Sequence, residues 1–248
     1  MNDLERRKFR LHADTADYDR RIQQATDWIH ATADEFGTPY VSISGGKDST
    51  VLYHLVAQRC GYDSMDVFHF DWGLRNVPGI EAHVRELVDR FGGTLVARSS
   101  EKVNDPDRFA NDEHHGMAGI MGWIRALRDE RGWDVGLLGI RAGESPTRRD
   151  RYTGTPPSHH DGIQPTVAPI HHLTTIDVWA YIVTQDLPYH DIYDEQGALF
   201  DGIDSRENRL VTIYDHEFAS LGSEAISQFL YPEATNELKD LEQRNLDH

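Results

Sequence analysis

A glycine turn at residues 44–49 joins a β-favouring run to an amphipathic helical pattern. The run at 40–44 leads into Ser-Gly-Gly-Lys-Asp-Ser, and apolar residues then recur at helical spacing from Val51 to Val56. Two adjacent glycines allow backbone N–H groups to converge, and the beginning of a helix adds the positive end of its dipole. A strand, a glycine turn and a helix in this order therefore predict an α/β fold with a phosphate cradle at the end of a strand.

The same order of strand and helix repeats along the chain. β-Favouring runs lie at 65–70, 94–97 and 135–139, and helical patterns lie between them at 80–91 and 117–131. Such alternation is typical of parallel strands with helices on both faces of the sheet. We therefore expect a doubly wound, mainly parallel sheet.

Helices are expected to surround this core. Tyr18, Ile22 and Ile29 recur at helical spacing in one entry helix, and a capping box of Thr174 and Asp177 begins another helix. We expect a single domain, 1–248, composed of an N-terminal helical arm at 1–39, a pyrophosphate-loop core at 40–197 and a C-terminal helical extension at 198–248.

The chain is strongly acidic. Lys and Arg total 25 against 42 Asp and Glu, which gives a net charge of −17. A surface of that sign repels nucleic-acid backbones and anionic lipid, so nucleic acid is not expected as a general ligand. Only Lys8, Lys47, Lys102 and Lys239 are lysines. An acid excess with few lysines indicates a halophilic host, and an ordinary acidic cytosolic protein is the alternative.

The cysteine content and the hydropathy exclude several classes of protein. Cys60 is the only cysteine, so an internal disulfide and a zinc site built from several cysteines are excluded. No run approaches the roughly 18 apolar residues that a membrane span needs, and residues 1–10 lack the apolar core of a signal peptide. We expect a cytoplasmic protein without membrane contact.

The chemistry of the glycine turn favours a bound polyphosphate. Ser44 and Ser49 add hydroxyl donors, and Lys47 adds positive charge beside the helix N-terminus. The pattern is not a Walker A loop, which would need Gly at Val41 and Ser or Thr at Asp48. A plain turn between strand and helix is the alternative interpretation.

Arginines gather after the predicted strand at 135–139. Arg141, Arg148, Arg149 and Arg151 lie near a strand end, where open α/β sheets bind ligands. Guanidinium groups suit phosphate or sulfate oxygens, and a solvated face that pairs with nearby carboxylates is the alternative. We therefore expect an anion site beside this strand end.

The segment at 141–164 has no clear period and is rich in Gly, Pro, Arg, Thr and His. Long irregular segments of compact domains commonly contact ligands. We expect this segment to be a mobile lid that orders over bound phosphates.

Two carboxylates beyond strand ends suggest a cation site. Asp48 and Asp71 can hold Mg²⁺, since this ion prefers one or two protein carboxylates together with substrate oxygens. For Asp71, a loop cap is the alternative. Paired histidines at 114–115, 159–160 and 171–172 lack the His-Glu-x-x-His spacing of a zinc site, so we expect them to be solvated or hydrogen-bonded.

Four ordered segments resemble one family. They are Ser-Gly-Gly-Lys-Asp-Ser at 44–49, Phe-Asp-Trp-Gly at 70–73 with Pro78, Gly-Ile-Arg-Ala-Gly-Glu-Ser at 139–145 with Arg148, and the Pro-Ile, Asp-Val-Trp, Leu-Pro-Tyr and Tyr-Asp runs between 169 and 194. From about residue 40 to 197, the chain resembles the phosphoadenosine phosphosulfate (PAPS) reductase family of the pyrophosphate-loop ATP pyrophosphatase superfamily.

The resemblance implies an adenine-nucleotide site at the strand ends, with ATP or PAPS as the ligand and Mg²⁺ as its companion on Asp48. Lys47, Arg141 and Arg148 would act in catalysis by neutralising charge that develops on an α-phosphate. The implied nucleotide-binding residues are Ser44, Gly45, Gly46, Lys47, Asp48, Ser49, Asp71, Gly139, Arg141, Glu144 and Ser145.

The chain also departs from the family pattern. Reductases of the family carry a nucleophilic cysteine in a C-terminal segment, and this chain has no cysteine after Asp194. Cys60 follows a predicted helix, where we expect a small buried side chain. In the second segment, Trp72 and the pair Gly79-Ile80 replace residues of the family pattern, so the family's substrate contacts are not carried over to that loop.

These features favour ATP-dependent adenylylation of a substrate with release of pyrophosphate, in sulfur metabolism or in modification of another molecule. PAPS reduction in sulfate assimilation and a nucleotide-binding module without catalysis stay open as alternatives. The expected partners are an adenine nucleotide and an unidentified acceptor, with a homodimer as a further expectation.

Overall fold

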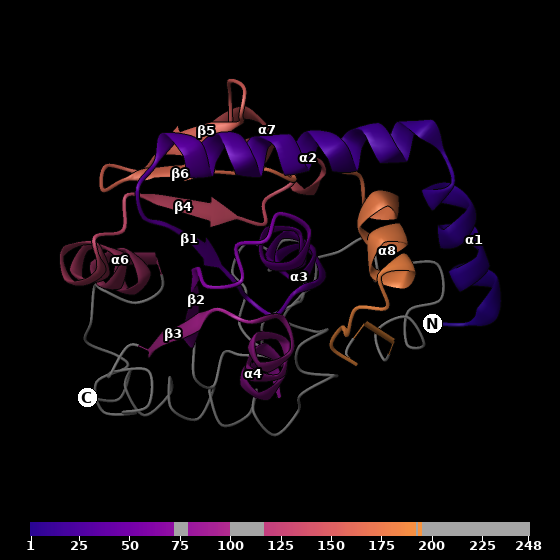
Figure 1. The fold of residues 1–248 in the computed structure, drawn as a ribbon, viewed down its shortest axis with the longest axis horizontal. Helices are drawn as coiled ribbons and strands as arrows, with labels where there is room; N and C mark the ends of the chain where they lie inside the picture. The colour runs from indigo at the N-terminus through magenta and orange to yellow at the C-terminus, as the bar shows by residue number, and fades with distance from the viewer. Residues whose placement is uncertain (72–78, 100–116, 192, 195–248) are drawn as a thin grey trace, which may run out of the picture.

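A computed structural model describes residues 1–71, 79–99, 117–191 and 193–194. Figure 1 shows a central sheet with helices on both sides, as the sequence predicts. The elements in chain order are α1 (Asp3–Ala13), α2 (Ala16–Glu35), β1 (Pro39–Ser42), α3 (Lys47–His54), the π-helical turn η1 (Leu55–Arg59), β2 (Asp66–Asp71), α4 (Ile80–Phe91), β3 (Thr94–Ser99), α6 (Met117–Arg131), β4 (Val135–Leu138), the 3-10 turn η3 (Ala142–Glu144), α7 (Pro146–Arg151), β5 (Ser158–His160), β6 (Pro165–Val167) and α8 (Thr175–Thr184).

The six strands form one sheet in the order β3-β2-β1-β4-β6-β5. Neighbouring strands are parallel except the edge strand β5, which runs antiparallel to β6. At the centre, Ser42 of β1 is in register with Phe68 of β2 and Leu138 of β4. The winding reverses at β1, and ligands of open α/β sheets bind at such a switch point. The doubly wound fold is therefore confirmed, and the glycine turn begins at its switch point.

The sheet is buried on both faces. Val41 of β1 belongs to a core that includes Val51 of α3 and Val84 of α4. Tyr40 belongs to a second core that includes Leu127 of α6. Adjacent residues of a strand point to opposite faces, so β1 contributes to both helical layers (Figure 1).

Two helices, rather than the one predicted, form the described N-terminal arm. α2 carries the expected apolar stripe, but in α1 only Phe9 is buried. Phe9 stacks on Trp179 of α8 with ring centroids 6.3 Å apart. A helix with one buried residue has no apolar period to detect, which is why the prediction missed α1.

A buried carboxylate ties this arm to the core. Asp177, in the first turn of α8, accepts hydrogen bonds from His12 Nε2 at 2.7 Å and Arg21 Nη2 at 2.8 Å. It also closes the capping box with Thr174 that the spacing predicted. Burial alone would raise the pKa of Asp177, but the bonds from Arg21, His12 and Thr174 outweigh burial and hold this pKa below its ordinary value of 3.8.

The segment at 141–164, expected to be irregular, contains short regular elements, and its role as a mobile lid stays a prediction. It contains η3, α7 and β5, and β5 pairs with β6 so that His159 lies opposite Thr166. Strands of three residues are too short to produce a detectable alternation in sequence.

Several predictions fall on residues outside the described part of the chain. They concern the C-terminal extension at 198–248, and Trp72, Gly73 and Pro78 of the second family segment. Among the helices of the described ranges, none combines the length and the apolar character that crossing a membrane requires.

We predict that Asp177→Asn lowers the free energy of unfolding by about 3 kcal/mol at pH 7, because it leaves Arg21 without its buried counter-ion. The lowered pKa of Asp177 stabilises the fold above the unfolded-state value near 4, and this contribution is lost as the pH falls through the folded-state pKa. Urea unfolding at pH 7 and pH 3 measures both effects.

The matched control for that experiment is Asp17→Asn, because the exposed carboxylate of Asp17 pairs with Arg20 on the surface of α2. It is expected to change stability by less than about 1 kcal/mol. Equal effects of the two substitutions would show that Asp177 does not anchor the arm.

Candidate active site

The glycine turn is held in shape by its two serines. Ser44 N–H donates to Ser49 Oγ at 3.2 Å, and Ser49 Oγ donates to the Gly46 carbonyl at 2.9 Å. Gly46 N–H in turn donates to Ser44 Oγ at 3.3 Å. The serines therefore hold the turn against the first turn of α3.

Position 45 favours glycine for two reasons, its backbone conformation and the close approach of a neighbouring side chain. Its φ of +78° lies in the left-handed region, and a Cβ at this position would lie 2.5 Å from Ile80 Cδ1. The glycine turn therefore packs directly against the first turn of α4.

A buried ionic cluster lies beneath the turn. The Asp48 carboxylate accepts from Lys47 Nζ at 2.8 Å and from Arg141 Nε at 2.6 Å. Only 7% of Asp48, 1% of Lys47 and 2% of Arg141 is exposed. Burial alone would raise the pKa of Asp48, but the charges of Lys47 and Arg141 and their hydrogen bonds hold this pKa below its ordinary value. Asp48 is thus an ionised counter-ion that joins α3 to the end of β4.

Two residues that the sequence analysis assigned no role complete the cluster. Tyr193 Oη accepts the backbone N–H of Lys47 at 3.0 Å, and Thr175 Oγ1 accepts from Arg141 Nη1 at 3.1 Å. Tyr193 is buried, and this burial raises the pKa of its phenol, so the group stays neutral. Tyr193 belongs to the Tyr-Asp run that carried the resemblance, whereas Thr175 lies between the Pro-Ile and Asp-Val-Trp runs. Only the three-dimensional contacts give the two residues a role.

Gly139, at the end of β4, allows this strand to approach α3. A Cβ at Gly139 would lie 2.8 Å from Ser49 Cα and 2.9 Å from Ser49 N, which are backbone atoms that cannot give way. The glycine therefore sets the distance between the phosphate turn and the Arg141 segment.

The four arginines of the predicted cluster do not gather at one point. Arg141 turns into the ionic cluster, whereas Arg148 pairs with Glu144 at 2.7 Å and the exposed Arg149 pairs with Asp150 at 3.1 Å. Arg148 and Arg149 thus make the local ion pairs of the alternative interpretation, and their contact with a bound anion stays a prediction.

Glu144 and Ser145 organise the turn that follows Arg141. Glu144 Oε2 accepts the backbone N–H of Arg141 at 2.8 Å, and Ser145 Oγ accepts that of Arg148 at 3.2 Å at the start of α7. These two residues thus shape the backbone around Arg141, and their contact with a nucleotide stays a prediction.

The geometry does not favour Asp48 as a magnesium ligand. Each carboxylate oxygen already accepts a hydrogen bond from a cation, and a further divalent ion beside Lys47 and Arg141 would be repelled. Asp71, the last residue of β2, is the other candidate carboxylate at this edge. Among the described residues, no three His, Cys, Asp or Glu side chains come together in a metal-binding arrangement.

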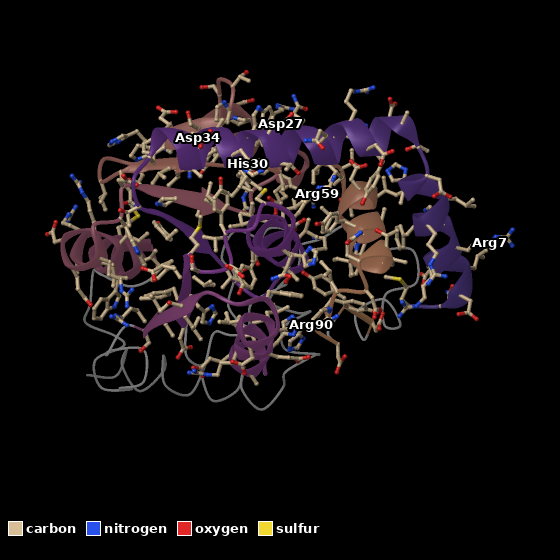
Figure 2. The ribbon with its side chains drawn as sticks, in the orientation of Figure 1. Arg7, Asp27, His30, Asp34, Arg59 and Arg90 are labelled. Carbon is tan, nitrogen blue, oxygen red and sulfur yellow. The ribbon has the colours of Figure 1, made fainter. Side chains whose placement is uncertain are left out.

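Cys60 has the environment of a packing residue. It follows η1 next to Arg59, which Figure 2 labels, and it packs against the main core. Burial raises the pKa of the Cys60 thiol to about 11, so thiolate is scarce at neutral pH. The expected non-catalytic character agrees with this setting.

The histidine pair at 171–172 makes hydrogen bonds to backbone carbonyl groups. His171 Nε2 lies 3.3 Å from the Arg148 carbonyl, and His172 Nε2 lies 2.9 Å from the Arg21 carbonyl. His30, labelled on α2 in Figure 2, similarly contacts Tyr62 Oη at 3.0 Å. Hydrogen-bonded histidines were expected at 171–172, and the pair at 114–115 lies outside the described residues.

Comparison with known proteins places the chain in a family. The sequence profile of the phosphoadenosine phosphosulfate reductase domain matches residues 38–228. The chain belongs to this family. The matched range includes the glycine turn, the ionic cluster and Tyr193, so the resemblance expected from the four segments is confirmed.

Curated relatives of this PAPS reductase family member are named sulfate adenylyltransferase subunit 2. The protein from Mycobacterium tuberculosis is 29% identical over 194 residues, which cover 68% of this chain and 62% of that relative. The protein from Mycolicibacterium vanbaalenii is 27% identical over 218 residues, which cover 78% of this chain and 69% of the relative. The chain thus spans somewhat less than two thirds of the length of the Mycobacterium tuberculosis protein.

Solved structures share the fold of this family member. PAPS reductase from Candida auris superposes with a TM-score of 0.54 at 15% identity and covers 72% of this chain and 90% of that one. FMN adenylyltransferase from Candida glabrata superposes with a TM-score of 0.57 at 17% identity and covers 73% and 61%. At these identities the likeness concerns the fold alone.

We predict that Gly139→Ala weakens ATP binding about tenfold, because the methyl group forces the Arg141 segment away from the phosphate turn. Gly143→Ala is the matched control, since a Cβ at Gly143 meets no atom within 4 Å. Calorimetric titration with ATP measures both affinities. If the two variants bind ATP equally well, the close approach at Gly139 does not shape the site.

Proposed function

We propose that this chain binds ATP at residues 44–49 and transfers its adenylyl group to an acceptor with release of pyrophosphate. The observation that carries this proposal is the glycine turn at the switch point of the sheet, held over a buried cluster of Lys47, Asp48 and Arg141. In this proposal the N-terminal end of the α3 dipole, at the glycine turn, provides the anion site. The names of the sulfate adenylyltransferase relatives support the same reaction class.

In the proposed reaction, an acceptor oxygen attacks the α-phosphorus, a new P–O bond forms and the bond to the β-phosphate breaks. Pyrophosphate leaves, and charge develops on the phosphate oxygens. Positioning and electrostatic stabilisation supply most of the catalysis of such transfers. We assign the stabilisation to the N–H groups of the glycine turn and the dipole of α3.

In this proposal, two cations are buried below the glycine turn, and a third can reach the bound phosphate. Lys47 and Arg141 are buried against Asp48, so they fix the turn and raise the positive potential beneath it. Arg148 is 28% exposed in its side chain and is the cation that can swing from Glu144 toward a phosphate. Mg²⁺ would bind as a complex with the polyphosphate and would be coordinated mainly by phosphate oxygens and water.

PAPS reduction is the second candidate, favoured by the description of the matching family. It needs a thiolate nucleophile, and Cys60 is the only cysteine of the chain. The half-buried thiol of Cys60, with its raised pKa, is poorly suited to that role. A nucleotide-binding module without turnover is the third candidate.

Other properties extend the proposal. We propose a single domain over 1–248 and a cytoplasmic, halophilic setting on the grounds of composition. Because the curated relatives are named as subunits, a partner subunit is the favoured assembly, with a homodimer as the alternative.

We predict that Lys47→Met lowers pyrophosphate release from ATP at least tenfold, because it removes a charge-assisted contact worth about 1.5 to 3 kcal/mol from the cluster. Methionine keeps the apolar stem of the side chain. The assay measures pyrophosphate with sulfate as the first acceptor, since the relatives are named for sulfate.

Cys60→Ser is the control and is expected to retain pyrophosphate release within about twofold, or about 0.4 kcal/mol of barrier. Sulfite formation from PAPS that disappears in Cys60→Ser would establish the reductase instead. ATP binding without pyrophosphate release under any condition would support the non-catalytic module.

A further inference from the structure

The first turn of α4 lies beside the phosphate turn and has no side-chain cap. Gly79 precedes this helix of 12 residues with φ of +84° and lacks a side-chain oxygen that could accept from the first N–H groups. The side chain of Ile80 in the same turn touches Gly45 of the phosphate turn. The positive end of the α4 dipole is thus adjacent to the nucleotide site.

His83 is a buried polar group of this turn without a partner at one nitrogen. Only 8% of His83 is exposed, and its Nε2 has no hydrogen-bond partner among the described residues. The imidazole packs edge-to-face on that of His190, which lies against Gly79 at the start of α4. A buried nitrogen without a partner is costly, and a bound ligand would satisfy it.

His190 approaches the same place from the segment after α8. Its ring centroid lies 5.8 Å from that of His83, and its Nε2 would lie 3.4 Å from a Cβ on Gly79. Three residues later, Tyr193 accepts the N–H of Lys47. This short segment therefore connects the beginning of α4 to the ionic cluster under the phosphate turn.

We propose that the N-terminus of α4, His83 and His190 form a subsite for a tetrahedral oxyanion, with sulfate as the acceptor of the adenylyl group. The inference rests on the proposed function, whose acceptor it names. Two imidazole groups and the first-turn N–H groups supply donors without a permanent positive charge. Glu81 of the same turn pairs with Arg85, so its charge is partly balanced.

Nearby charges influence how the subsite works. Burial lowers the pKa of His83, His190 lowers it further, and Glu86 and Asp191 raise it. The two carboxylates oppose an approaching anion, but they also favour a protonated imidazole once the anion is in place. The imidazole can then form a charge-assisted hydrogen bond to the anion.

Sulfate suits the chemistry of this site. It is fully ionised at neutral pH, so its oxygen can attack the α-phosphorus without losing a proton. One P–O bond forms, the bond between the α- and β-phosphates breaks, and pyrophosphate takes the electron pair. No general base is needed.

The test uses the full chain with ¹⁵N-labelled histidine and follows the imidazole resonances during titration with sodium sulfate. Sodium chloride at equal ionic strength is the reference for screening, and sodium phosphate shows whether the subsite prefers sulfate. We expect saturable shifts of the His83 and His190 resonances with sulfate and none with chloride. Equal responses to sulfate and chloride would overturn the subsite, and tighter binding of phosphate would overturn the assignment to sulfate.

Substitutions test the same proposal. His83→Gln and His190→Gln are each expected to weaken sulfate binding at least tenfold while ATP affinity stays within twofold. His30→Gln is the matched control, since His30 is a half-buried, hydrogen-bonded imidazole on α2. Unchanged sulfate affinity in His190→Gln overturns the inference even if His83→Gln fails to fold.

The outcomes separate this inference from the proposed function. Sulfate binding that depends on His83 and His190, but without pyrophosphate release, would keep the subsite and reject adenylylation. Pyrophosphate release with an acceptor other than sulfate, in a protein that does not bind sulfate, would keep adenylylation and reject the subsite.

Discussion

The buried carboxylate of Asp48 is the interaction on which the candidate site depends. It lies between Lys47 Nζ and Arg141 Nε, two cations separated by 94 positions (141 − 47) in the sequence. A buried charge is tolerated only when it is paired and hydrogen-bonded, so all three groups must stay together. This requirement fixes the end of β4 against the beginning of α3, and it holds the phosphate turn at the switch point of the sheet.

Glycines and one tyrosine make that arrangement sterically possible. Gly139 lets β4 approach Ser49, and Gly45 lets the turn pack against Ile80. Tyr193 then covers the cluster and accepts the N–H of Lys47. The phosphate turn is therefore held by β4, by α4 and by the segment after α8, and each brings polar groups to the carboxyl edge of the sheet.

Local patterns predicted much of this structure. The order of strand, glycine turn and helix, the apolar stripe of α4 and the capping box of α8 depend on neighbouring residues, which a sequence displays directly. The inward direction of Lys47 and the pairing of Arg141 with Asp48 depend on contacts between distant segments, so they were missed. The strands β5 and β6 were missed because each contains only three residues.

A crystal structure of the protein with a non-hydrolysable ATP analogue tests the central claim most directly. The account predicts the polyphosphate at the glycine turn of residues 44–49, with Asp48 still between Lys47 and Arg141. A nucleotide bound elsewhere on the sheet would contradict the account. A polyphosphate that draws Arg141 away from Asp48 would contradict the role given to the buried cluster.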